Sequence, residues 1–155
     1  MVMTIFDALP YISILIVSIA LVYGAYEDVK TRIAPKWIWY VTAPFALITT
    51  ALWYLATVLY GDPTLAFVLF LTTVILCPVC MYMGFRMGNG GDWRALFFVS
   101  LLTPWIAPLT IMCSAILGVI QVMIDTFRYG KEYSSAWMVS IAASFGIASL
   151  AYLFI

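Results

Sequence analysis

Two aspartates of this chain stand where a carboxyl group can do chemistry. Asp28 follows a long apolar run in "YGAYEDVKTR", and Asp92 precedes another in "GNGGDWRAL". An ionisable side chain at the border of the hydrocarbon region is costly and is often functional. Two carboxyl groups in contact cannot both ionise easily, so the pair shares one proton. Such a pair suits aspartyl proteolysis: one carboxylate activates a water, and the protonated partner polarises the scissile carbonyl.

The residues beside Asp92 favour its approach to another helix. Gly90 and Gly91 lack a Cβ atom, so we expect the backbone there to pass close to a neighbour and to adopt positive φ angles. Asp92 would begin a helix, where the macrodipole favours the anion, whereas Asp28 would end one, where an anion is disfavoured. The dipole argument therefore favours the negative charge on Asp92.

The absence of histidine narrows the chemistry further. It excludes Ser-His and Cys-His catalysis, HExxH zinc proteases and histidine proton relays. A Ser-Lys protease is poorly supported because no serine signature stands beside the loop lysines. The three cysteines lie in apolar runs, and the one CxxC lacks the second ligand pair of a zinc site, so we expect packing residues and no metal or cofactor: Cys77, Cys80 and Cys113.

The composition is that of a multi-span membrane protein, since 66% of the 155 residues are hydrophobic and only 9% are charged. Spans of roughly 20 residues leave room for about six helices and no soluble domain. We therefore predict one membrane-embedded, all-α domain over residues 1–155, a six-helix bundle. The expected spans are about 5–26, 37–60, 64–85, 93–106, 107–127 and 134–155.

The break between the fourth and fifth spans needs a separate argument. As a single helix, the apolar stretch 95–127 would be about 50 Å long against a hydrocarbon core of roughly 30 Å. Pro104 and Pro108 in "TPWIAP" favour a tight turn instead. Six spans with both termini outside also put every basic residue on one side, which the positive-inside rule makes cytoplasmic: Lys30, Arg32, Lys36, Arg86, Arg94, Arg128 and Lys131.

The remaining acidic residues have ordinary explanations. Asp7 and Asp62 fall on the outer side, the latter in an Asp-Pro turn. Asp125 and Glu132 lie near basic residues at the cytoplasmic side, where a surface role suffices. Glu27, Asp28 and Asp92 are then left at one membrane face, and the alternative reading is that they simply end helices in the interfacial zone.

These residues resemble the signatures of a known family. "YGAYEDVKTRIAPKW" is similar to the first signature of the type IV leader peptidases (prepilin and preflagellin peptidases), with Asp28 closing a helix and Pro35 seven residues later. "GNGGDWRAL" resembles the second, GxGD followed by a basic residue, with Gly91, Asp92 and Arg94 in the matching places. Three positions depart from the family pattern: Ala34, Lys36 and Asn89, the last at the first glycine of GxGD.

The resemblance implies a GxGD-type membrane aspartyl protease of the plasma membrane. It would remove the basic leader of pilin-like or archaellin-like precursors at the cytoplasmic face, with Asp28 and Asp92 as catalytic residues. The four-cysteine loop of the methyltransferase members is missing, which implies a short, peptidase-only form. Residues that would bind substrate or shape the loops are Glu27, Pro35, Gly90, Gly91 and Arg94.

Two other classes of function remain open. A small transporter would place ionisable residues near the bilayer midplane on broken helices, whereas these carboxylates lie near helix ends. A non-enzymatic membrane subunit would carry Asp28 and Asp92 as interfacial caps and tolerate their conversion to amides. Nothing in the sequence indicates nucleic-acid binding, and the partners we expect are precursor proteins and the lipid bilayer.

Overall fold

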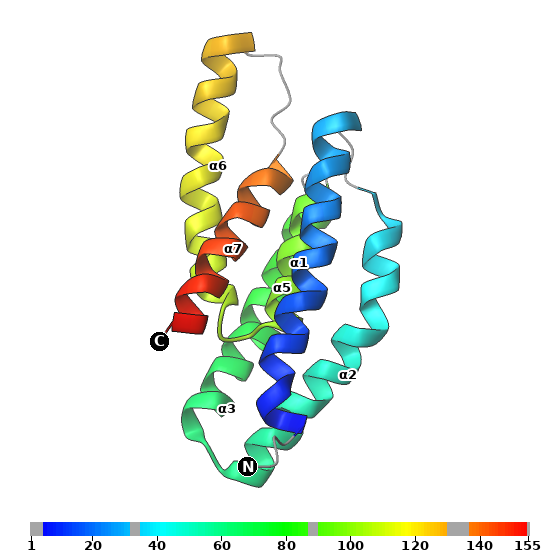
Figure 1. Ribbon diagram of the computed structural model, residues 1–155, viewed down its shortest axis with the longest axis vertical. Coiled ribbons are helices and arrows are strands. Elements are labelled where there is room, and N and C mark those ends of the chain that lie inside the picture. The colour runs from blue at the N-terminus through cyan, green and yellow to red at the C-terminus, as the bar shows by residue number, and fades with distance from the viewer. Residues whose placement is uncertain (1–4, 32–34, 87–89, 130–136, 155) are drawn as a thin grey trace.

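The computed structural model describes residues 5–31, 35–86, 90–129 and 137–154, and all the regular structure in these ranges is helical. The predicted all-α fold is thus confirmed for this part of the chain. The elements form an up-and-down bundle (Figure 1). They are α1 (Ile5–Thr31), α2 (Trp37–Tyr60), α3 (Pro63–Phe70), the π-helical segment η1 (Leu71–Leu76), α4 (Cys77–Arg86), α5 (Gly90–Leu102), α6 (Ala107–Tyr129) and α7 (Trp137–Phe154).

Five helical stretches of the described chain are long and apolar enough to cross a membrane: α1, α2, the continuous α3–η1–α4, α6 and α7. This supports the membrane character expected from the composition. The fourth predicted span, 93–106, is different, because α5 has only 13 residues. At 1.5 Å per residue it is about 20 Å long, short of a hydrocarbon core of roughly 30 Å. Among the described residues, a sixth full-length span is therefore not observed.

The predicted break in "TPWIAP" is confirmed, since α5 ends at Leu102 and α6 begins at Ala107. Figure 1 shows this turn within the bundle, where Thr103 and Pro104 are buried. Its backbone groups remain satisfied, because the Ile106 and Ala107 amides both donate to the Thr103 carbonyl, at 3.0 and 2.9 Å. An interior turn explains why α5 is short.

Helix α5 lies at the centre of the bundle and contacts α1, α2, α4, α6 and α7. Its Ala95 and Val99 are fully buried, and Phe98 stacks on Trp39 of α2 with ring centroids 5.5 Å apart. The other helices leave many large apolar side chains exposed on their outer faces, as lipid-facing helices do. The short helix is thus the one that the others enclose.

A π-helical segment interrupts the third helical stretch and was not predicted. The amide of Cys77 donates to the carbonyl of Thr72, five residues back, which is the π pattern. Cys77 and Cys80 follow on α4 and are buried against the core, and the Cys77 thiol faces the carbonyl of Phe97 at 3.9 Å. Both cysteines are free, and they pack as the sequence predicted.

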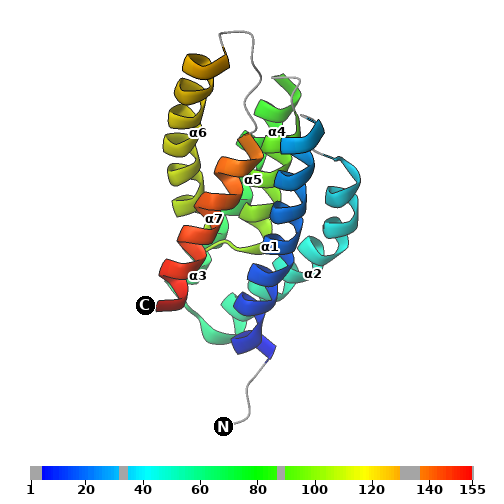
Figure 2. The same ribbon diagram turned by 45° about the horizontal axis from the view of Figure 1, so that its top comes forward.

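Six helix termini meet at one end of the bundle, which we call the polar end: α1, α4 and α6 finish there, and α2, α5 and α7 begin there (Figures 1 and 2). The basic residues Lys30, Lys36, Arg94 and Arg128 lie on these termini. Arg32 and Lys131 fall outside the described residues. Asp28 and Asp92 both belong to the polar end, so the predicted sharing of one face agrees with the arrangement of the helices.

Candidate active site

Asp28 is a buried carboxylate in the last turn of α1. Only 8% of its surface is exposed, although the neighbouring Val29 and Lys30 are exposed. The main-chain amide of Met138 donates to its Oδ2 at 3.3 Å. Met138 is the second residue of α7, so Asp28 faces the positive end of that helix dipole. A hydrogen bond from an amide to a carboxylate stabilises the anion.

Two glycines allow α7 to start close to its neighbours. A Cβ atom on Gly24 of α1 would lie 2.6 Å from the terminal methyl of Met138, and one on Gly118 of α6 would lie 2.9 Å from the indole of Trp137. Met138 and Trp137 therefore occupy the space that a side chain larger than glycine would need at positions 24 and 118. Gly24 precedes Asp28 by one helical turn and lies on the same face of α1. The close approach of Met138 to Gly24 therefore keeps the Met138 amide near Asp28, to which it donates a hydrogen bond.

Asp92 lies in the first turn of the central helix α5 and is partly buried. Burial, and to a smaller extent the negative charge of Asp28, together raise the pKa of this carboxyl from 3.8 to about 7. Desolvation disfavours a charged group, and a like charge nearby adds to the effect. Asp28 thus contributes to the electrostatic environment of Asp92, and their helices α1 and α5 are in contact.

The charge on the two aspartates depends on more than the dipoles of their own helices. The dipole argument favours the anion on Asp92, whereas burial, with a smaller contribution from Asp28, raises its pKa to about 7, so a proton on Asp92 is accessible near neutral pH. Asp28 ends its own helix, yet the start of α7 supplies it with an amide donor. A third helix therefore contributes to the environment of the pair.

Known proteins give no independent guide to this site. No family model, curated protein or solved structure matches the chain at a significant level. The resemblance to the type IV leader peptidases therefore rests on the two sequence signatures alone.

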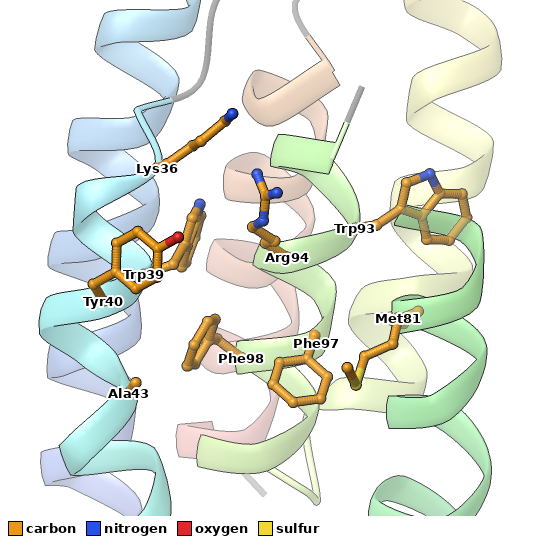
Figure 3. Close-up of a pocket in the computed structure, with 10 residues that line it drawn as sticks. Lys36, Trp39, Tyr40, Ala43, Met81, Trp93, Arg94, Phe97 and Phe98 are labelled. Carbon is orange, nitrogen blue, oxygen red and sulfur yellow. The ribbon is translucent and has the colours of Figure 1, made fainter. Parts of the chain in front are cut away.

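The other predicted site residues do not all join the pair. Glu27 is half-buried on α1, but successive helical residues point about 100° apart, so it does not share the face of Asp28. Pro35 is half-buried in the connection to α2. Arg94 lies two positions after Asp92 on α5, is exposed, and lines a separate groove beside Lys36 (Figure 3). Roles of these three in substrate binding stay predictions.

The glycines before Asp92 need a correction. Gly90 and Gly91 are the first two residues of α5, so their backbone is helical and the expected positive φ angles are wrong. In the part of the chain that the structure describes, only Gly61 has a positive φ. The turn itself belongs to residues 87–89, including Asn89, which fall outside the described residues.

Sequence reasoning missed the contribution of α7. Met138 acts through its main-chain amide, so its side chain gives no chemical signal. Gly24 and Gly118 were visible only as small residues on apolar helices. A glycine exactly one turn before a suspected catalytic aspartate is the one clue that could have been noticed.

The arrangement can activate a water between two unlike carboxyls. One has an amide donor that favours its anion, and the other has a pKa near neutrality and so can hold or release a proton. Among the described residues, no group of three or more histidine, cysteine, aspartate or glutamate side chains gathers in a metal-binding arrangement. The chemistry that two such carboxyls can supply is general acid–base chemistry.

Proposed function

We propose that this chain is a membrane aspartyl endopeptidase that cuts the basic leader from type IV pilin-like or archaellin-like precursors. The observation that carries the proposal is that α1 and α5 are in contact and place Asp28 and Asp92, which belong to separate peptidase-like signatures, at the same end of the bundle, where Asp28 contributes to the raised pKa of Asp92. Neighbouring carboxyls with different environments are the usual mark of an acid–base pair. The family resemblance supplies the substrate class.

In the proposed reaction, Asp28 is the general base and Asp92 the general acid. Asp28 takes a proton from water as the water oxygen attacks the carbonyl carbon of the scissile peptide. Asp92 gives its proton to the carbonyl oxygen, which forms a neutral tetrahedral diol. On collapse, the amine nitrogen receives the proton held by Asp28, the C–N bond breaks, and a diol proton returns to Asp92. Each carboxyl ends in its starting state.

The position of the pair suits a substrate with a polar leader joined to an apolar helix. Asp28 and Asp92 lie at the polar end of the bundle, level with the starts and ends of helices rather than at mid-length. A precursor helix lying beside the bundle would present its leader junction at this level. The leader would remain in water, where the hydrolytic water is also available.

We further propose that the polar end faces the cytoplasm of the plasma membrane. Its basic residues support this orientation through the positive-inside rule. In this arrangement both chain termini are outside, and the short α5 counts as the sixth pass because the longer helices surround it. Fusion of a reporter to each connection would test the orientation.

The test is cleavage of a candidate precursor, co-expressed with the chain and followed by gel shift. Asp28→Asn and Asp92→Asn should each abolish cleavage, because an asparagine can neither take nor give the required proton. Glu27→Gln and Asp125→Asn should retain most of it, and they are matched controls because each removes one negative charge near the polar end. All variants must be present in the membrane at equal levels.

A non-enzymatic membrane subunit is the alternative that this experiment separates. In such a subunit Asp28 and Asp92 would be structural. Precursor processing in the cell would then be the same with the amide variants as with the parent chain. Normal leader removal by either variant would reject the proposed dyad.

A further inference from the structure

A groove on the outer surface near the polar end is separate from the aspartate pair. It has a volume of about 300 Å³ and lies between α2 and α4, with α5 beneath it (Figure 3). Its lower part is apolar and is formed largely by Phe97 and Phe98 of α5, Ala43 of α2 and Met81 of α4. An apolar furrow of this kind on a membrane protein accommodates a hydrocarbon chain.

The upper end of the same groove carries two cations. Lys36 at the start of α2 and Arg94 on α5 stand above the aromatic floor in Figure 3. Both are exposed, and within the described residues neither forms an ion pair with a carboxylate. Two exposed cations on neighbouring helices are complementary to a single anionic group lying between them.

We propose that this groove binds an anionic phospholipid. Its phosphate would lie between Lys36 and Arg94, and one acyl chain would run down over Phe97 and Phe98. The groove is cationic at the polar end and apolar below it. A lipid in a bilayer leaflet has the same order, with its headgroup at the surface and its acyl chains below. Basic residues near the membrane surface attract anionic lipids by about 1 kcal/mol each.

The charges also argue against the proposed peptide substrate as the occupant. A basic leader would be repelled by Lys36 and Arg94 at the mouth of the groove. Because Arg94 stands two positions beyond Asp92 on α5, it points away from the aspartate pair and toward this groove. The lipid and the leader would thus use different sides of the same helix.

Native mass spectrometry of the detergent-purified chain tests the headgroup contact. The protein is titrated with phosphatidylglycerol or with phosphatidylcholine of the same acyl chains. We expect tighter binding of phosphatidylglycerol, and a loss of about thirty-fold in its affinity in the double variant Lys36→Gln, Arg94→Gln. The double variant Lys30→Gln, Arg128→Gln is the matched control, since it removes the same charge from the polar end outside the groove.

Filling the groove tests the acyl-chain contact. Ala43→Phe should weaken binding of phosphatidylglycerol, whereas Ala51→Phe, on an exposed part of α2, should not. Equal affinity for the two lipids, or an equal loss in the control double variant, would overturn the proposal. So would an Ala43→Phe variant that binds phosphatidylglycerol normally but no longer binds a precursor, because the groove would then belong to the peptide.

Discussion

Two turns of this chain place an aspartate after glycine at the start of a helix, and they use it differently. In "YGDP", Asp62 is exposed, and its Oδ1 accepts hydrogen bonds from the amides of Thr64 and Leu65 at 2.8 and 3.3 Å. In "GGDW", Asp92 is partly buried and interacts with Asp28 of another helix. The first aspartate caps its own helix, whereas the second faces a partner.

The difference comes from tertiary surroundings and not from the local sequence. Gly61 takes the left-handed conformation that ends α2, with a φ of 61°, and Asp62 then turns its carboxylate toward its own backbone. Helix α5 begins before its aspartate, in the centre of the bundle and against α1. Asp62 accepts hydrogen bonds from its own helix, whereas burial and the nearby Asp28 raise the pKa of Asp92.

The largest expected effect is a loss of activity that occurs at one of the two turns and not at the other. Asp92→Asn should lower the rate of precursor cleavage at least about 10³-fold, because the general acid is lost. Asp62→Asn should leave the rate within about two-fold, since asparagine is an equally good N-cap. Rates are measured with purified variants in detergent on one precursor. Similar losses at both positions would show that the two turns do not differ in function.

The pH profile of cleavage should depend on Asp92 and not on Asp62. The pKa of Asp92 is raised to about 7, so the group is protonated below that pH and loses its proton above it. The rate should therefore fall about ten-fold per pH unit on the alkaline side of pH 7. Asp62→Asn should have the same profile as the parent. A rate that stays constant up to pH 9 would contradict the role of Asp92 as the acid.

A smaller effect is expected from the glycines that position α7. Gly118→Ala would press a methyl group into the ring of Trp137 and should destabilise the protein by about 1–3 kcal/mol, with partial loss of cleavage as Met138 shifts away from Asp28. Gly146→Ala on α7 is the matched control, because nothing lies within 4 Å of its added Cβ. Thermal unfolding in detergent and the cleavage rate provide the two measurements. Equal behaviour of the two variants would rule out the proposed role of this close contact.

The smallest effect concerns the cap alone. Asp62→Ala removes the acceptor for the Thr64 and Leu65 amides and should cost about 1 kcal/mol of stability, with cleavage unchanged at permissive temperature. Thermal unfolding of this variant beside Asp62→Asn isolates the cap, since asparagine can still accept the bonds. A cleavage defect in Asp62→Ala at a temperature where it is folded would connect this turn to the active site.

Much of the fold could be predicted from the sequence because apolar runs and prolines mark where most of the helices begin and end. The bounds 37–60 of α2, the turn in "TPWIAP" and the burial of Cys77 and Cys80 follow from apolar runs and proline positions. The short fourth helix was also expected, since the predicted span 93–106 has about the length of α5. The π segment η1 was not predicted, because hydrophobicity along the chain does not distinguish π from α backbone.

The site was predictable at the level of residue types and not at the level of protonation. Charge placement and two signatures brought Asp28 and Asp92 to one face, and the helices agree with this. The dipoles of α1 and α5 taken alone include neither the burial of Asp92 nor the amide donor of Asp28. That donor is the main-chain amide of Met138, and a main-chain group far along the chain has no sequence signal.

The most direct measurement of the central claim is the titration of the Asp92 carboxyl by ¹³C NMR in aspartate-labelled protein. Its resonance is assigned by its loss in Asp92→Asn. In the parent, we expect a titration near pH 7, and in Asp28→Asn a lower pKa that stays above 3.8, because burial remains when the neighbouring charge is gone. An Asp92 titration that is identical in the parent and in Asp28→Asn would show that the two carboxyls do not interact, and it would contradict the account.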